Sequence, residues 1–225
     1  MKILEYGYYD FASNESETKE TISKIIKYQP TTVFVLPYYT KSIKPLLKDY
    51  NIGLGTVIDY PFGLSDLKTR MSAVDAISKS GVDVLDVVAP TSLLCNRKYD
   101  KFRDDINTHR DACAQFGIEL RYTIDYRIFT LDLLYKVAQI LVGHQINTIY
   151  PSSNYFLDNL TDNILASALI NKKIDNINII VNGNAWTDKH ADMLLSHKQI
   201  YGYKTNNAYM LETLVNKLHS INQEY

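Results

Sequence analysis

VIDYPFG (residues 57–63) and VLDVVAP (residues 84–90) are the two stretches that decide the fold of this chain. Each is short, rich in β-branched residues and closed by Gly or Pro, which is typical of a buried strand. Between them, apolar residues recur every three or four positions from Ser65 to Lys79, and this spacing predicts a helix. The result is one strand–helix–strand unit of about thirty residues, the building block of a parallel sheet.

Asp86 is the unusual residue of this unit, because it places a carboxylate inside an otherwise apolar strand. Burying an isolated charge costs several kcal/mol or more, so a buried carboxylate is normally paired or used in chemistry. We therefore expect an amine, a guanidinium or a hydroxyl within hydrogen-bonding reach of Asp86. Arg121, Tyr150 and Lys204 are the candidate partners.

Composition indicates an ordinary globular protein. The 225 residues are 46% hydrophobic and 22% charged, with a net charge of −1. The absence of a basic run argues against a nucleic-acid partner or an anionic membrane surface. No segment reaches the roughly 18 apolar residues of a membrane helix, and Cys95 and Cys113 form no CxxC pair. These features predict a cytoplasmic protein with free thiols.

The strand-then-helix pattern repeats eight times along the chain. The predicted strands begin near residues 3, 31, 52, 82, 118, 146, 177 and 199. The predicted helices cover 17–28, 39–50, 65–80, 98–117, 130–143, 158–172, 187–196 and 207–222. Eight units of roughly 28 residues without a linker predict one (β/α)8 TIM barrel over residues 1–225. A doubly wound open sheet is the alternative, but it normally has fewer strands, and no Gly-rich dinucleotide fingerprint follows the first strand.

In such a barrel the functional residues lie at the carboxyl ends of the strands. Four carboxylates are predicted there: Asp10, Asp59, Asp86 and Asp125. Carboxylates in one mouth repel each other unless a cation, an amine or shared protons offset them. One or two of the four are alternatively expected to point outward or to cap a helix. Mg²⁺ would suit oxygen ligands, but no spacing demands it, so we predict no metal and no cofactor.

These stretches resemble the deoxyribose-phosphate aldolase family. In that family a Gly-Phe-Pro-x-Gly loop precedes a helix and then a strand of the form Gly-Ala-x-x-hydrophobic-Asp-hydrophobic-Val. VIDYPFG and SGVDVLDVVAP (residues 80–90) match this arrangement without a gap. The resemblance implies a TIM barrel, a carbon–carbon lyase and a proton-shuttling role for Asp86.

The family's two lysines are missing at the matching positions. The segment TIYPSSNY (residues 148–155) has Tyr150 where the resemblance implies the Schiff-base lysine, and IIVNGN (residues 179–184) has Ile180 where it implies the second lysine. A phenol cannot form an imine, which is the electron sink for carbon–carbon cleavage. One phosphate-binding glycine is retained at Gly183, and the next is replaced by Asn184.

Two basic residues remain on predicted strands. Lys204 lies on the final strand, GYKT (residues 202–205). A lysine near a strand end more often extends toward solvent than into a barrel, and the alternative is that Lys204 points into the mouth as a replacement amine. Arg121 lies inside the fifth strand, where we expect an ion pair with Asp86 or Asp125 or a contact with an anionic substrate.

The sequence thus predicts a candidate site and leaves three functions open. The predicted catalytic residues are Asp86, Tyr150 and Lys204. The predicted ligand-binding residues are Asp10, Asp59, Arg121, Asp125, Ser152, Asn182, Gly183 and Thr205. The first function is an aldolase-like barrel without standard Schiff-base activity that still binds a small carbonyl or sugar-type ligand. The second is a lyase or isomerase using Lys204 or Asp86 with Tyr150. The third is a non-catalytic subunit or scaffold, and a homodimer is compatible with each of them.

Overall fold

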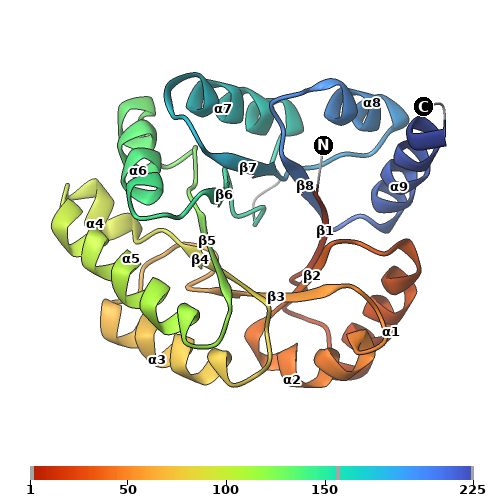
Figure 1. The fold of residues 1–225 in the computed structure, drawn as a ribbon, viewed down its shortest axis with the longest axis horizontal. Coiled ribbons are helices and arrows are strands. Elements are labelled where there is room, and N and C mark those ends of the chain that lie inside the picture. The colour runs from red at the N-terminus through yellow and green to blue at the C-terminus, as the bar shows by residue number, and fades with distance from the viewer. Residues whose placement is uncertain (1–2, 156–157, 224–225) are drawn as a thin grey trace.

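The protein is a closed parallel barrel surrounded by helices (Figure 1). The computed structural model describes residues 3–155 and 158–223, and within these ranges eight strands follow one another around the ring in chain order. Each strand pairs in parallel with the next, and β8 pairs with β1 through the register Glu5 to Lys204. This confirms the predicted (β/α)8 barrel.

The strand bounds follow the sequence pattern closely. They are β1 (Ile3–Tyr8), β2 (Thr32–Val35), β3 (Gly53–Ile58), β4 (Val84–Val88), β5 (Glu119–Thr123), β6 (Thr148–Tyr150), β7 (Asn178–Val181) and β8 (Gly202–Thr205). The helices are α1 (Glu15–Ile25), α2 (Thr40–Ile43), α3 (Leu67–Ser78), α4 (Thr91–Cys95), α5 (Tyr99–Ala114), α6 (Leu131–Gly143), α7 (Leu160–Lys173), α8 (Asp188–Ser196) and α9 (Ala208–Gln223).

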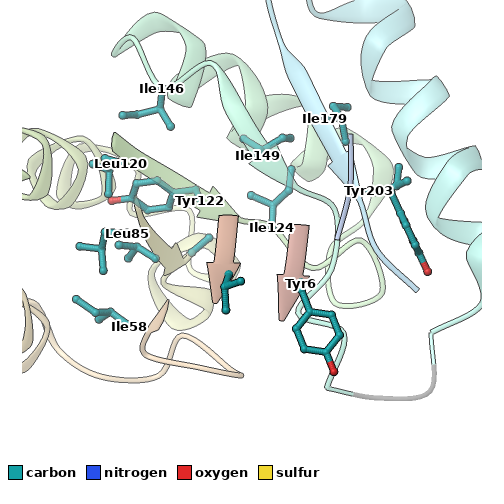
Figure 2. Packing of buried hydrophobic residues seen from close by; sticks show 14 of the residues in the cluster. Tyr6, Ile58, Leu85, Leu120, Tyr122, Ile124, Ile146, Ile149, Ile179 and Tyr203 are labelled. Atoms are coloured by element: carbon teal, nitrogen blue, oxygen red, sulfur yellow. The ribbon is translucent and has the colours of Figure 1, made fainter. Parts of the chain in front are cut away.

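Side chains along each strand point alternately toward the surrounding helices and into the lumen of the barrel. Leu85 and Val87 lie in the large apolar cluster between strands and helices, in which Figure 2 labels Leu85 with Tyr122 and Ile149. Because successive strand side chains point to opposite faces, Asp86 is turned into the barrel. A second, small cluster fills the lumen and contains Phe34, Val84, Tyr150 and Ile180.

Two helical segments differ from the prediction. The helix expected over residues 39–50 is broken into α2 and flanking 3-10 turns at Pro37–Tyr39 and Lys44–Leu47. Pro45 lacks the N–H that a continuous helix requires, which accounts for the break. The short helix α4 was not predicted and follows β4 directly.

The loop after β3 is held tightly against β4. Gly63 has φ +64°, and a Cβ at this position would lie 2.1 Å from the Ala89 carbonyl oxygen. Only glycine fits such an approach. The Gly63 carbonyl accepts a hydrogen bond from the Thr91 N–H at 3.0 Å, so this contact fixes the loop that carries Tyr60 over the barrel mouth.

Across residues 3–155 and 158–223, every helix is too short or too polar to cross a bilayer.

Candidate active site

An ion pair between Lys204 and Asp86 lies inside the barrel. The residues come from β8 and β4, which are opposite each other in the ring. Lys204 Nζ is 3.2 Å from Asp86 Oδ2, and the residues are 3% and 2% exposed. Thr123 Oγ1 lies 2.9 Å from each carboxylate oxygen of Asp86. Of the two orientations open to Lys204, the structure therefore has the inward one, and Lys204 is the partner of Asp86 among the three candidates, because the buried carboxylate attracts the amine.

Aromatic rings complete the surroundings of the amine. Lys204 Nζ is 3.5 Å from the ring centroid of Tyr150, 4.7 Å from that of Phe34 and 5.7 Å from that of Tyr9. An ammonium over the face of such rings is attracted by their quadrupole, more strongly when water is excluded. The rings and Asp86 together explain how a lysine is accommodated in the lumen.

Arg121 belongs to a second buried network beside this pair. Its Nη1 donates to Glu5 Oε1 at 2.6 Å and to the Tyr150 hydroxyl at 2.8 Å, and the Tyr150 hydroxyl donates to Glu5 Oε2 at 2.8 Å. The remaining Arg121 donors bind Glu119 at 2.7 and 2.8 Å. The expected pairing of Arg121 with Asp86 or Asp125 is wrong, because Glu5 and Glu119 satisfy the guanidinium.

This network keeps both Arg121 and Tyr150 in their protonated forms. Burial acts to lower the pKa of Arg121, but Tyr150, Glu5 and Glu119 outweigh it and raise that pKa. Burial raises the pKa of Tyr150 well above its ordinary value, and the Glu5 carboxylate adds to the effect. Tyr150 is therefore a neutral phenol whose proton is already donated to Glu5.

Two of the predicted mouth aspartates instead stabilise the loops. Asp59 accepts from the Ser65 N–H and, at 2.7 Å, from Arg70 Nη1. Asp125 accepts from Arg127 Nη2 at 2.5 Å, and Arg127 also binds Asp158. Their carboxylates are thus engaged in ion pairs with neighbouring arginines.

The predicted ligand-binding residues on β6 to β8 are also engaged within the protein. Ser152 Oγ lies 2.5 Å from Asn182 Oδ1, and Asn182 Nδ2 donates to the Ser152 carbonyl at 2.6 Å. The Gly183 carbonyl accepts from the Tyr203 hydroxyl at 2.7 Å. Thr205 Oγ1 accepts from the Asn207 N–H at 3.0 Å. The structure thus directs these groups to internal contacts.

A pocket of about 450 Å³ opens at the carboxyl end of the barrel. It is built by the loops that follow β1, β3, β6 and β8, and its lining residues are Gly7, Tyr8, Tyr9, Asp10, Phe11, Ala12, Tyr60, Asn154, Tyr155 and Asn206. Asp10 is the one predicted ligand-binding residue in this lining; its Oδ1 accepts from the Ala12 N–H at 2.8 Å.

Tyr9 connects the pocket to the buried ion pair. Its ring lines the pocket and also faces Lys204 Nζ. Its hydroxyl oxygen is buried and has no hydrogen-bond partner among the described residues. Burial raises the pKa of Tyr9 well above its ordinary value, with Asp86 adding to the effect. Tyr9 is therefore a neutral ring between the pocket and the amine.

Sequence reasoning missed Glu5 and Thr123, which complete the two networks. The signal was available in the alternation of β1: Leu4 and Tyr6 are apolar and pack toward the helices, which turns Glu5 into the lumen. In the described ranges, no three His, Cys, Asp or Glu side chains are grouped to hold a metal ion.

Comparison with known proteins gives a consistent result. The chain is 26% identical over 115 residues to the deoxyribose-phosphate aldolase of Caldicellulosiruptor saccharolyticus, covering 51% of this chain and 52% of that enzyme. It is 22% identical over 143 residues to deoxyribose-phosphate aldolase 1 of Mesoplasma florum, covering 64% of each. These matches span about half to two-thirds of the length of the curated relatives. No protein-family model matches the chain.

Solved structures agree with the sequence matches. QR15, an aldolase, superposes with a TM-score of 0.85 at 16% identity, over 96% of both chains. The chain resembles deoxyribose-phosphate aldolases. A tetrameric deoxyribose phosphate aldolase from Aeropyrum pernix superposes with a TM-score of 0.79 at 14% identity, over 97% of this chain and 90% of that one. At these identities the superpositions show the fold, and the aldolase-like barrel is what sequence and structure share.

Proposed function

We propose that this aldolase-like barrel is a carbonyl lyase whose imine-forming amine is Lys204. The observation that carries the proposal is the 3.2 Å contact between Lys204 Nζ and Asp86 Oδ2 in the lumen. Catalysis through an imine requires an amine together with a group that accepts and returns its protons. Lys204 and Asp86 supply these two functions, and Tyr150 and Ile180 occupy the positions where the family resemblance implies lysines.

The chemistry follows from this pair. Asp86 accepts a proton from the Lys204 ammonium, and the free amine adds to the substrate carbonyl carbon. Loss of water, with the proton supplied from Asp86, gives an iminium. The Asp86 carboxylate, which has given up its proton, takes the proton of the β-hydroxyl group. The bond between the α- and β-carbons breaks, the β-carbon fragment leaves as the first carbonyl product, and the electron pair of the bond enters an enamine on Lys204. Protonation of the enamine α-carbon by Asp86 regenerates an iminium, and its hydrolysis by water releases the second carbonyl product and the amine. The step requires Tyr9 to turn aside, because its ring lies between the pocket and Lys204.

The alternatives have less support. A ligand-binding barrel without Schiff-base activity would leave the buried Lys204 amine beside Asp86 without a role. Acid–base chemistry by Asp86 with Tyr150 would need the Tyr150 proton, but that proton is donated to Glu5 in a buried hydrogen bond. A non-catalytic barrel would have no need of a buried lysine–aspartate pair, since an apolar replacement of a buried ion pair is often as stable or more stable. Residues 1–225 as one domain and a homodimer remain predictions.

Borohydride trapping tests the proposal. The wild-type protein is incubated with a small aldehyde and sodium borohydride and then digested for peptide mass spectrometry. We expect a reduced adduct on Lys204 and its loss in Lys204→Met. Lys217→Met, which removes a surface lysine that pairs with Asp192 on the helical layer, serves as the matched control and keeps the adduct. No adduct on Lys204 in the folded wild-type protein would overturn the proposal.

A further inference from the structure

The mouth pocket has the composition of a site for a flat, uncharged ligand. Aromatic rings from three loops converge on it. The ring centroids of Tyr9 and Tyr60 are 5.0 Å apart, those of Phe11 and Tyr60 are 6.0 Å apart, and those of Tyr60 and Tyr155 are 6.1 Å apart. Pockets for small molecules are typically lined by aromatic and apolar side chains with a few polar groups.

Exposure of these rings to solvent supports a binding role. Phe11 is 61% exposed and Tyr155 is 45% exposed, although both lie at the rim of a pocket rather than on a flat surface. Apolar side chains grouped at the surface often mark a ligand site. Burial raises the pKa of Tyr60 above its ordinary value, so its hydroxyl stays protonated and available as a hydrogen-bond donor.

Electrostatics at the mouth disfavours an anion. The described residues that line the pocket include no Lys, Arg or His, and Asp10 is the one carboxylate among them. The positive charge of Arg127, which acts on Tyr60, is offset by Asp125 and Asp158. A phosphate at this mouth would therefore meet the Asp10 carboxylate and no cation from the described lining residues.

Two backbone donors near the ends of β7 and β8 are also occupied. Phosphates in barrels bind to free N–H groups at loop ends and helix N-termini. Here the Asn184 N–H after β7 donates to the Asp158 carbonyl at 2.8 Å, and the Asn207 N–H after β8 donates to Thr205 Oγ1 at 3.0 Å. Helix α8 begins with the carboxylate of Asp188 in its first turn. An anion would have to displace or oppose each of these groups.

We infer that the pocket binds the ring of an uncharged aromatic β-hydroxy carbonyl compound, whose α–β carbon–carbon bond can be cleaved through an imine, and that the substrate of the Lys204 site is not phosphorylated. Benzaldehyde is a probe for this pocket: it presents the ring and forms the imine but has no bond to cleave. The inference rests on the proposed function for the chemistry, and on the lining of the pocket for the substrate class. The aromatic ring of the ligand stacks on Phe11 and Tyr60, and its carbonyl group is directed toward Tyr9 and the amine beneath it.

Binding by calorimetry tests the substrate class apart from the chemistry. Benzaldehyde is titrated into the double variant Asp86→Asn/Lys204→Met, which has no amine in the lumen to form an imine and leaves no unpaired buried charge, and deoxyribose 5-phosphate and inorganic phosphate are the competing probes. We expect benzaldehyde to bind, Phe11→Ala to weaken binding by about tenfold through loss of one stacking partner, and neither phosphate compound to compete. Phe116→Ala is the matched control, since Phe116 is 51% exposed and precedes β5 at the opposite end of the barrel.

The outcomes separate the two proposals. Competition by inorganic phosphate or deoxyribose 5-phosphate would overturn the uncharged-ligand inference, and so would equal effects of Phe11→Ala and Phe116→Ala. A borohydride adduct on Lys204 with deoxyribose 5-phosphate but not with benzaldehyde would overturn the inference while supporting the proposed function. Phe11-dependent binding of benzaldehyde without any adduct in the wild-type protein would leave the pocket assignment standing and overturn the lyase.

Discussion

At the scale of single residues, the effect of replacing Lys204 on the free energy of unfolding depends on whether Asp86 is present, and the reverse also holds. Removal of one member leaves the other as an uncompensated buried charge, which costs about 3–5 kcal/mol. We therefore expect Asp86→Asn and Lys204→Met each to destabilise the protein strongly. The double variant should lose much less than the sum of the two, because both charges are then gone.

Urea unfolding of the four proteins near neutral pH measures this coupling. Lys44→Met, which breaks an exposed pair with Asp83, provides the control and should change the free energy of unfolding by no more than about 1 kcal/mol. Strictly additive effects of Asp86→Asn and Lys204→Met would show that the two side chains do not interact in solution.

The hydroxyl of Tyr9 provides a second residue-scale prediction. A buried hydroxyl without a partner costs about 1–3 kcal/mol, so Tyr9→Phe should raise the melting temperature. Tyr203→Phe is the matched comparison, because the Tyr203 hydroxyl donates to the Gly183 carbonyl at 2.7 Å in a fully buried setting. That variant should lower the melting temperature. A decrease for Tyr9→Phe as large as that for Tyr203→Phe would indicate that Tyr9 has a hydrogen-bond partner in solution.

At the scale of elements, Arg70 joins α3 to its neighbours. Its guanidinium donates to Asp105 on α5 through Nε and Nη2, both at 2.9 Å, and to Asp59 after β3. Arg70 also donates to the Val88 carbonyl of β4 at 2.9 Å. The position of the loop that carries Tyr60 therefore depends on a buried arginine in the helical layer.

Asp105→Asn should make this dependence measurable. Burial acts to raise the pKa of Asp105, but hydrogen bonds and charge from His109 and Arg70 outweigh it, and the pKa is lowered. A carboxyl with a lowered pKa stabilises the fold above its unfolded pKa of about 4, and this contribution is lost as the pH falls through the folded value. We expect Asp105→Asn to cost about 3–5 kcal/mol near neutral pH and progressively less in acid.

Urea unfolding as a function of pH provides the measurement. Asp104→Asn, at the exposed neighbouring position, should track the wild-type protein throughout. A deficit for Asp105→Asn that stays constant from neutral pH into acid would contradict the assigned charge state of Asp105.

A comparison of the elements shows which features of the structure can be predicted from the sequence alone. Alternating β-branched strands and periodic helices were enough to predict the barrel, since both patterns are local. The break at Pro45 has a local signal too. The direction of Lys204 has none, because it depends on Asp86 across the ring and on Phe34 and Tyr150 from other strands. Likewise, Arg121 lies near Glu5, which is 116 positions away in the chain.

At the scale of the whole molecule, side chains fill the lumen of the barrel so densely that one added methyl group is expected to lower the stability. A Cβ on Gly55 would lie 2.5 Å from the Phe34 ring, whereas one on Gly143 would meet nothing within 4 Å. Gly55→Ala should therefore destabilise the protein by about 1–3 kcal/mol through overpacking. Gly143→Ala, at the end of α6, should stabilise it by about 0.5–1 kcal/mol.

Thermal unfolding of the two variants compares the same chemical change in two environments. Phe34→Leu in the Gly55→Ala background should restore part of the lost stability, because it removes the ring that the new methyl group meets. Equal shifts for the two alanine variants would show that the lumen is less densely packed than the structure indicates.

The register of β1 with β8 has a consequence for synthesis. Glu5 lies on the first strand of the ring, whereas Lys204 lies on the last strand and is synthesised only after the other seven. Until β8 joins the ring, the barrel is open, and the lumen residues Asp86, Phe34 and Tyr150 lack the Lys204 amine that contacts them in the closed barrel. The buried ion pair can therefore form only once the ring closes, and a nascent chain stalled before β8 carries every helix from α1 to α8 but lacks the amine that we propose as the nucleophile.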